Sequence, residues 1–189
     1  MSTTATRLQK SIDQSMNSVE RDLLPTFDLP AQEQDHWCWA AVAAAVRSFL
    51  GSSNVVQCQV ATEVLPGDCC RNPGRGNVDA GLQAALGETL REYLPAQVPF
   101  DAIQQEIDAN HPVCARVVWD ADRDGVGESA HFVVIHGYEM RDTEPYLHVK
   151  DPLNGISPNS MATSHTVHFD DFRFRYLLMG TWLQTYLVK

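Results

Sequence analysis

The sequence predicts an α+β fold in one domain, with a helical lobe in the first half and an antiparallel sheet lobe in the second. Two observations predict this order. The segment Trp37–Leu50 is rich in alanine and apolar all round, whereas later runs are β-branched and aromatic and are divided by turn residues. The chain has 189 residues, 44% hydrophobic and 20% charged, so it can bury one core and is neither a disordered nor a collagen-like chain.

Residues 1–30 are expected to form a flexible N-terminal arm, and residues 31–189 the folded domain. The arm is polar, its apolar positions are sparse, and it ends in the proline-punctuated stretch LLPTFDLP. It lacks the apolar region and cleavage site of an ordinary secretory signal, and no stretch of the chain approaches the ~18 apolar residues that cross a bilayer. We therefore expect a soluble protein without membrane insertion, either cytoplasmic or secreted by a route without a classical signal peptide.

The main helix is expected over Trp37–Leu50, because alanine favours helix and Gly51 supplies a stop. Asp35 is a candidate cap for its start. Residues 52–76 form a turn-rich connection. Three shorter helices are expected around Val60, over Asn77–Leu86 and over Asp101–Asn110.

The second half is expected to form an antiparallel meander, which would pack on the helical lobe and leave a groove between the two. Its runs combine β-branched and aromatic residues with Asp, Gly or Pro at the turns. The five expected strands are Val113–Trp119, His131–Tyr138, Tyr146–Lys150, His165–Phe169 and Gly180–Val188.

Cys38 lies in the first turn of the expected main helix, where unpaired N–H groups and the helix dipole favour a thiolate. A nucleophilic thiolate needs a base and an acceptor that orients the base. His131 opens a strand, and Asp151 ends the next one, so one hairpin brings them together. Gln32, six residues before Cys38, is a candidate oxyanion donor, with Gln34 as the alternative.

Three motifs carry a resemblance to a known family. They are Gln32–Ala41 (QEQDHWCWAA), Ala130–Tyr138 (AHFVVIHGY) and Val149–Pro152 (VKDP). In this order they resemble the papain-like cysteine peptidases, and within them the compact bacterial branch that includes bacteriocin-leader peptidases and effector cysteine peptidases of plant pathogens. The resemblance covers roughly residues 30–188, and it implies a papain-like fold.

The resemblance also implies the roles of the candidate residues. Cys38 would be the nucleophile, His131 the base and Asp151 the residue that orients it. Gln32 would help to form the oxyanion hole, and no cofactor or metal would be needed. Ala130 stands where members of this branch often have glycine, and its methyl group would narrow substrate access.

The expected function is therefore hydrolysis of peptide bonds through a thioester acyl-enzyme. One alternative is acyl transfer of the transglutaminase type by the same residues, and another is a catalytically silent peptide-binding domain. The net charge of −10 argues against nucleic acid as a partner, so a protein or peptide substrate is expected. The sequence predicts no oligomeric state.

Several residues have both a structural and a functional interpretation. Trp37 and Trp39 are expected to pack in the core, with the substrate groove as the alternative. Cys114 is expected in the core, and His36 is close enough in sequence to influence Cys38.

Cys58, Cys69 and Cys70 share one turn-rich loop, where a disulfide of Cys58 stays open and zinc binding is disfavoured because no His is near. The segment Asp120–Gly125 resembles the opening of a calcium loop, but its twelfth position is His131 rather than Glu. A solvated turn is therefore expected over Asp120–Asp124, with calcium as the alternative.

Overall fold

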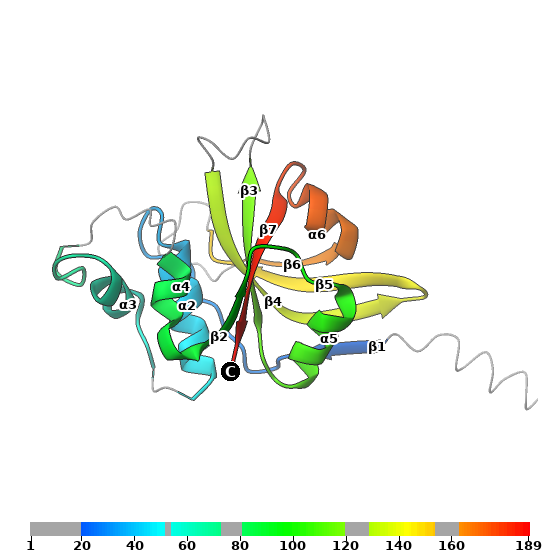
Figure 1. The fold of residues 1–189 in the computed structure, drawn as a ribbon, viewed down its shortest axis with the longest axis horizontal. Helices are drawn as coiled ribbons and strands as arrows, with labels where there is room; N and C mark the ends of the chain where they lie inside the picture. The colour runs from blue at the N-terminus through cyan, green and yellow to red at the C-terminus, as the bar shows by residue number, and fades with distance from the viewer. Residues whose placement is uncertain (1–19, 52–53, 73–80, 120–128, 154–162) are drawn as a thin grey trace, which may run out of the picture.

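The computed structural model describes residues 20–51, 54–72, 81–119, 129–153 and 163–189. Short helices come mainly first, and most strands follow (Figure 1). The elements are β1 (Glu20–Leu23), α2 (Cys38–Phe49), α3 (Gln57–Val64), α4 (Gly81–Leu86), the 3-10 helix η1 (Gly87–Thr89), β2 (Leu90–Leu94), α5 (Phe100–Asp108), β3 (Val113–Trp119), β4 (Ser129–Arg141), β5 (Glu144–Asp151), β6 (Thr163–His168), α6 (Phe169–Arg175) and β7 (Thr181–Val188).

The strands form one antiparallel sheet in the order β2-β7-β3-β4-β5-β6, and β1 pairs with β4 outside this path. The expected meander is therefore wrong for its last strand, because β7 returns to pair with β3 instead of with β6. The long strand β4 is its centre. β3 pairs with residues 129–135 of β4, β1 with residues 137–140, and β5 with residues 134–141. Because neighbours cover β4 along most of its length, the side chains that it carries have well-defined positions.

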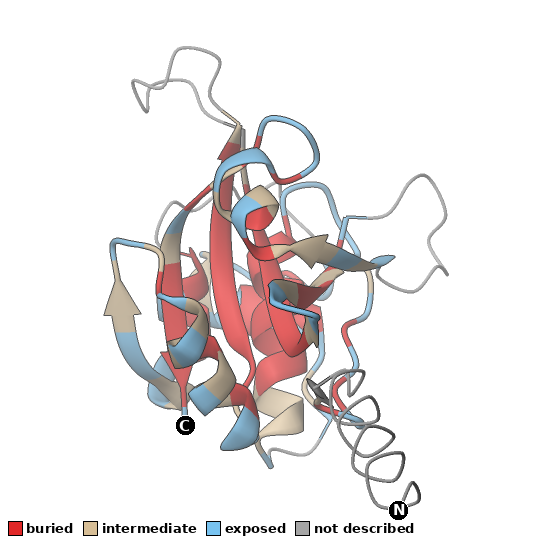
Figure 2. Cartoon of the chain, turned by 90° about the vertical axis from the view of Figure 1, so that its right-hand side faces the viewer, coloured by how far each residue is buried: buried red, intermediate tan, exposed pale blue. Residues whose placement is uncertain are grey.

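Helices cover both faces of this sheet. Figure 1 shows α2, α3 and α4 together on one side and α5 and α6 on the other. The central strands and α2 are buried (Figure 2), and six successive residues of β3, Val113–Val118, are buried whichever way they face. This burial on both faces explains why β3 lacks the alternation of a half-exposed strand, and its single charged residue, Arg116, is itself buried.

The helix α2 agrees with the expected main helix, and Gly51 follows it with φ of 109°, a backbone conformation that favours glycine. The expected cap is wrong: the N-cap residue is Trp37, and its side chain makes no capping hydrogen bond. Nine residues in succession from Cys38 to Val46 are buried. The start of α2 therefore lies inside the protein.

The end of the expected flexible arm packs on the domain. Strand β1 pairs with β4, and Leu24, Phe27 and Leu29 are buried in the core. Residues 20–30 thus differ from the expectation, because their main-chain pairing and three apolar side chains attach them, while residues 1–19 lie outside the described residues. Within the described parts of the chain, no helix is both long and apolar enough to span a membrane.

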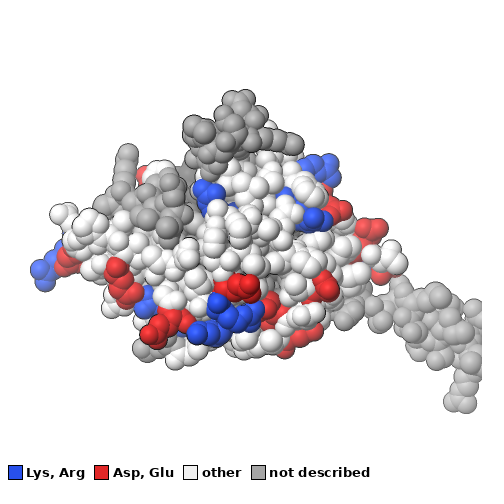
Figure 3. Space-filling view, in the orientation of Figure 1, with Lys and Arg blue, Asp and Glu red and all other residues white. Residues whose placement is uncertain are grey.

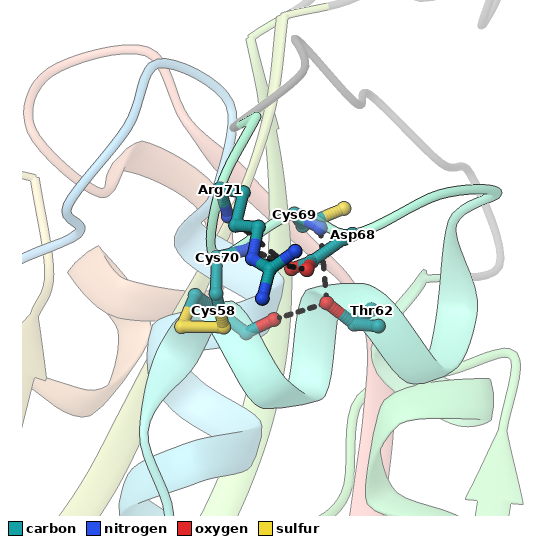
Figure 4. The surroundings of a disulfide bond; sticks show 6 residues. All are labelled: Cys58, Thr62, Asp68, Cys69, Cys70 and Arg71. Carbon is teal, nitrogen blue, oxygen red and sulfur yellow. Dashed lines mark hydrogen bonds and ion pairs between the residues drawn. A yellow bond between two sulfur atoms is a disulfide. The ribbon is translucent and has the colours of Figure 1, made fainter.

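Cys58 on α3 forms a disulfide with Cys70, which the sequence left open (Figure 4). Thr62, one turn further along α3, accepts a hydrogen bond from the N–H of Cys69 at 3.0 Å. The thiols of Cys69 and Cys114 are buried outside any disulfide, and burial raises the pKa of Cys114 to about 12, as a core position requires. The Asp120–Asp124 segment, with its calcium alternative, lies outside the described residues.

Candidate active site

A cleft of about 450 Å³ lies between the start of α2 and the ends of β3, β4 and β5. The helical side and the sheet side each contribute several residues to its wall. The lining residues are Gln32, Asp35, His36 and Cys38 on the first side, and Trp119, Ala130, His131, Asp151, Leu153 and Leu177 on the second. The four residues predicted from the sequence as a catalytic site therefore line one cleft.

Cys38 is the first residue of α2, and the residue is 6% exposed. Its position at the N-terminus of a buried helix places it beside the positive end of the helix dipole. His36, two residues earlier, lines the same cleft and has φ of 64°, which is uncommon for a residue other than glycine. The chain thus makes a sharp turn just before the thiol.

His131 bonds two of the other residues predicted as catalytic, Asp151 and Cys38. Its Nε2 lies 2.6 Å from Oδ1 of Asp151, and the ring is also in hydrogen-bond contact with the thiol of Cys38. Because Nε2 faces Asp151, Nδ1 is the ring nitrogen left for Cys38. The strand register explains the contact between His131 and Asp151. Lys150 of β5 pairs with Val134 of β4, so Asp151 lies opposite the next position toward the start of β4. That position is two residues from His131 and therefore on the same face of the strand.

Electrostatics favour the protonated imidazole. Burial lowers the pKa of His131, but hydrogen bonds and Coulombic attraction to Asp151 and Cys38 outweigh burial and raise this pKa to about 10. Burial also acts to raise the pKa of Asp151, yet its hydrogen bonds and its attraction to His131 hold that pKa below the usual value. At neutral pH the site therefore holds an imidazolium against a carboxylate.

The carboxylate of Asp151, a residue 2% exposed, has donors on both oxygens. Oδ1 accepts from His131 and from the N–H of Leu153 at 2.8 Å, and Oδ2 accepts from the hydroxyl of Tyr176 at 3.1 Å. Burial and the adjacent carboxylate raise the pKa of Tyr176, so this hydroxyl stays a donor. Its turn carries no sequence signal that would have identified Tyr176 as part of the site.

Trp119 is the aromatic wall of the cleft. Its ring centroid lies 6.2 Å from that of His131 and 6.2 Å from that of Tyr176. Trp37 and Trp39, the tryptophans nearest to Cys38 in sequence, are buried in the core as expected, and neither lines this cleft. The pairing of β3 with β4 was the available signal for Trp119, since it places Val117 opposite His131.

Gln32 is held at the cleft by its own hydrogen bonds. Its N–H donates to the carbonyl of Pro152 at 2.9 Å, and its side-chain Nε2 donates to the carbonyl of Gln34 at 3.0 Å. An amide NH₂ has two hydrogens, so one remains for a group in the cleft. The side chain of Gln34 is exposed and does not line the cleft; this residue instead supports Gln32 through its carbonyl.

An exposed apolar turn borders the cleft. Leu177 lines the cleft, while Leu178 is 89% and Met179 75% exposed. Leu177 and Leu178 have φ of 47° and 83°, and Tyr176 and Gly180 close the turn with two main-chain hydrogen bonds of 2.8 Å. Gly180 is required there, since an added Cβ would lie 2.7 Å from the Tyr176 carbonyl oxygen and from a methyl carbon of Val117.

No group of three His, Cys, Asp or Glu that could hold a metal occurs in the described part of the chain. What the described geometry provides is a buried helix start with a thiol, facing a His that belongs to a sheet and bonds a carboxylate. This combination of an α+β fold with a cysteine and a histidine on opposite sides of a cleft is typical of papain-like cysteine peptidases.

Comparisons with known proteins agree with that class. The model of the Peptidase_C39-like family matches residues 26–182, so the chain belongs to this family and is related to the cysteine peptidases. A solved Bacillus anthracis structure, provisionally described as a C39-like peptidase, has a TM-score of 0.58 and 19% sequence identity over 90% of this chain and 98% of the other. This likeness shows the shared fold. Among curated proteins, no sequence match was found.

Proposed function

We propose that the protein hydrolyses peptide bonds of protein or peptide substrates, with Cys38 as the nucleophile, His131 as the acid and base, and Asp151 as the residue that orients His131. One observation carries this proposal: His131 contacts the thiol of Cys38 and the carboxylate of Asp151 within a single cleft. A buried structural cysteine would not require a charged His–Asp pair beside it.

In the first half of the reaction, the Cys38 thiolate attacks the carbonyl carbon of the substrate, and its electron pair forms the C–S bond. The carbonyl oxygen becomes an oxyanion. When the tetrahedral intermediate collapses, the C–N bond breaks and the imidazolium of His131 gives its proton to the departing amine. The products of this half are a free amine and a thioester on Cys38.

In the second half, neutral His131 takes a proton from water, and the oxygen of that water attacks the thioester carbon. The C–S bond then breaks, a carboxylic acid leaves, and the thiolate–imidazolium pair forms again. Asp151 stays ionised throughout, since its three donors stabilise the carboxylate and keep the imidazole ring in place. These steps require no cofactor.

The oxyanion is proposed to lie between the remaining side-chain N–H of Gln32 and the main-chain N–H of Cys38. Gln32 and Cys38 line the same cleft, and the hydrogen bond from Gln32 to the Gln34 carbonyl limits the rotation of its amide. A donor fixed before the reaction stabilises charge without reorganisation at the moment when charge develops.

Charge and redox state bear on the substrate and on the place of action. Among the described residues on the face in Figure 3, Lys and Arg are interspersed with Asp and Glu and form no basic patch of the kind that binds nucleic acid. Ala130 lines the cleft, and we propose that its methyl group narrows access to the thiol. Between the cytoplasm and secretion without a classical signal peptide, the Cys58–Cys70 disulfide supports the oxidising, secreted alternative.

The test is covalent labelling with an epoxide inhibitor of thiol peptidases between pH 5 and 8, followed by mass spectrometry to locate the adduct. We expect an adduct on Cys38 at pH 6, no adduct on Cys69 or Cys114, and loss of labelling in His131→Ala. A Cys69→Ala variant is the matched control and should label like the wild type. Equal, slow labelling of several cysteines, or none at all, would refute the proposal and favour a peptide-binding domain.

A further inference from the structure

Gln57 is a buried amide that the proposed reaction leaves unused. It is the first residue of α3, and it is 3% exposed. Its Nε2 donates to the carbonyl of Ala31 at 2.7 Å, and its Oε1 accepts from the N–H of Glu33 at 2.9 Å. One side chain thus bonds the main chain on both sides of Gln32.

We propose that Gln57 is a positioning residue for Gln32 and determines how well the oxyanion is stabilised; this inference rests on the proposed function. The segment 31–34 is not part of a helix or of one of the named strands, so no regular main-chain ladder fixes it. Gln57 replaces such a ladder. With both neighbours of Gln32 bonded, rotation about the side-chain bonds is the main freedom that its amide keeps, and the bond to Gln34 reduces it.

The helix α3, which carries Gln57, is itself held in place. The next residue, Cys58, is joined to Cys70 by the disulfide (Figure 4). Near the other end of α3, Glu63 pairs with Arg47 of α2 at 2.7 Å. Because α2 begins with Cys38, the thiol and the oxyanion donor are connected through one bonded path: α2, the Arg47–Glu63 pair, α3 and Gln57.

The opposite end of the segment reaches the sheet side. The N–H of Gln32 donates to the carbonyl of Pro152, the residue that follows Asp151. Gln32 therefore takes its position from α3 and from the end of β5 together. Loss of the Gln57 amide removes only the α3 part and leaves the contacts among Cys38, His131 and Asp151 in place.

Two reactions of Cys38 separate these effects without a known substrate. Alkylation by iodoacetamide requires the thiolate and forms no oxyanion, whereas acylation by p-nitrophenyl acetate passes through a tetrahedral oxyanion and releases p-nitrophenolate. In Gln57→Met we expect the acylation rate constant to fall about tenfold and the alkylation rate constant to stay within about twofold of the wild type. Gln59→Met, an exposed position on the same helix, is the matched control and should change neither rate.

A double variant tests whether Gln57 acts through Gln32. If it does, Gln57→Met lowers acylation in the wild-type background but has almost no further effect in Gln32→Ala. A purely structural role would lower both rates, or would lower acylation by the same factor in both backgrounds, and either result would overturn the inference.

If Gln57→Met does not fold, Gln57→Glu keeps the acceptor for the Glu33 N–H and loses the donor to Ala31 at neutral pH, and the ratio of the two rates must again fall. A wild-type protein whose Cys38 is not acylated at all contradicts the proposed function. Normal acylation in wild type and in a folded Gln57→Met contradicts only the role of Gln57.

Discussion

The two sides of the cleft hold their polar groups by different means. On the sheet side, His131 and Asp151 stand on buried, paired strands and are joined through side-chain hydrogen bonds to each other and to Tyr176. On the helical side, Gln32 stands on an irregular segment that is bonded through its main chain. The sheet side therefore carries the groups that determine ionisation in the site, and we propose that the helical side determines where the oxyanion is stabilised.

Among the substitutions on the two sides, removal of His131 should lower the reactivity of Cys38 most. In His131→Ala, Asp151 loses its charged partner and the thiol loses its base, so acylation of Cys38 is expected to fall at least about 10³-fold. Alkylation at pH 6 should fall too, because the defect is one of ionisation. Stopped-flow p-nitrophenolate release measures the first rate. His111→Ala, in the turn before β3, is the control, and equal rates in both variants would contradict the assignment of the base.

The disulfide should matter next, and for stability rather than chemistry. A Cys58→Ala/Cys70→Ala variant loses a cross-link with a sequence separation of 12, which is expected to lower the free energy of unfolding by about 3 kcal/mol. Acylation should fall only severalfold, since Gln57 keeps its partners. Urea unfolding compares this variant with Cys69→Ala. A loss of His131-dependent alkylation in this variant would show that the helical side also controls the ionisation of the site.

Gln32→Ala should produce a pattern opposite to that of His131→Ala. Acylation is expected to fall about 10²-fold, equivalent to about 2.7 kcal/mol, while alkylation by iodoacetamide stays unchanged. Gln34→Ala is the matched control, since it keeps the carbonyl that supports Gln32. If Gln34→Ala proves the more damaging substitution, Gln34 and not Gln32 is the oxyanion donor.

Tyr176→Phe should have a smaller effect confined to the sheet side. It removes the donor to Oδ2 of Asp151 and leaves that buried oxygen with less stabilisation, at a cost of about 1.5 kcal/mol in unfolding. Alkylation at pH 6 should slow less than tenfold. Tyr186→Phe removes a hydroxyl that bonds a neutral partner, Gln184, and serves as the thermal-unfolding control. A stability loss no greater than in Tyr186→Phe would argue against a charged acceptor.

The pH dependence of stability gives the most gradual test. His131 has a pKa near 6.5 when unfolded and about 10 when folded, so its stabilising contribution is complete below pH 6.5 and disappears as pH rises toward 10. The difference in unfolding free energy between wild type and His131→Ala should shrink with a slope of at most about 1.4 kcal/mol per pH unit. If urea unfolding gives the same difference between the two proteins at pH 6, 8 and 9.5, the ion pair is contradicted.

Much of the fold followed from local patterns. The apolar runs predicted β3 to β7, and the alanine-rich segment predicted α2. β1 was missed because its ERDL sequence is polar and its pairing with β4 uses main-chain groups, which every residue type supplies. β2 and α6 were missed for a related reason: LREYL and FDDFRFR are short and rich in charge, and tertiary contacts decide their conformation.

The residues of the candidate site fall into the same two groups, those that the sequence predicted and those that it missed. Cys38, His131 and Asp151 each lie close to the end of a regular element. Hairpin pairing predicted that His131 and Asp151 lie close together, whereas the resemblance to papain-like peptidases implied that Cys38 acts with them. Tyr176 and Gln57 reach the site from an irregular turn and from a short helix. Their contacts depend on how distant segments pack, and no spacing in the chain encodes that distance.

The turn Leu177–Met179 bears on self-digestion, in which one molecule of a peptidase cleaves another. Exposed leucine and methionine in a loose loop would be open to attack by a neighbouring molecule. Here the two bonds between Tyr176 and Gly180, with left-handed backbone at Leu177 and Leu178, hold the segment far from the extended form in which peptides bind along a groove. We therefore expect the first self-cleavage sites, located by mass spectrometry of a concentrated sample, to fall outside this turn, which its own folding protects from digestion.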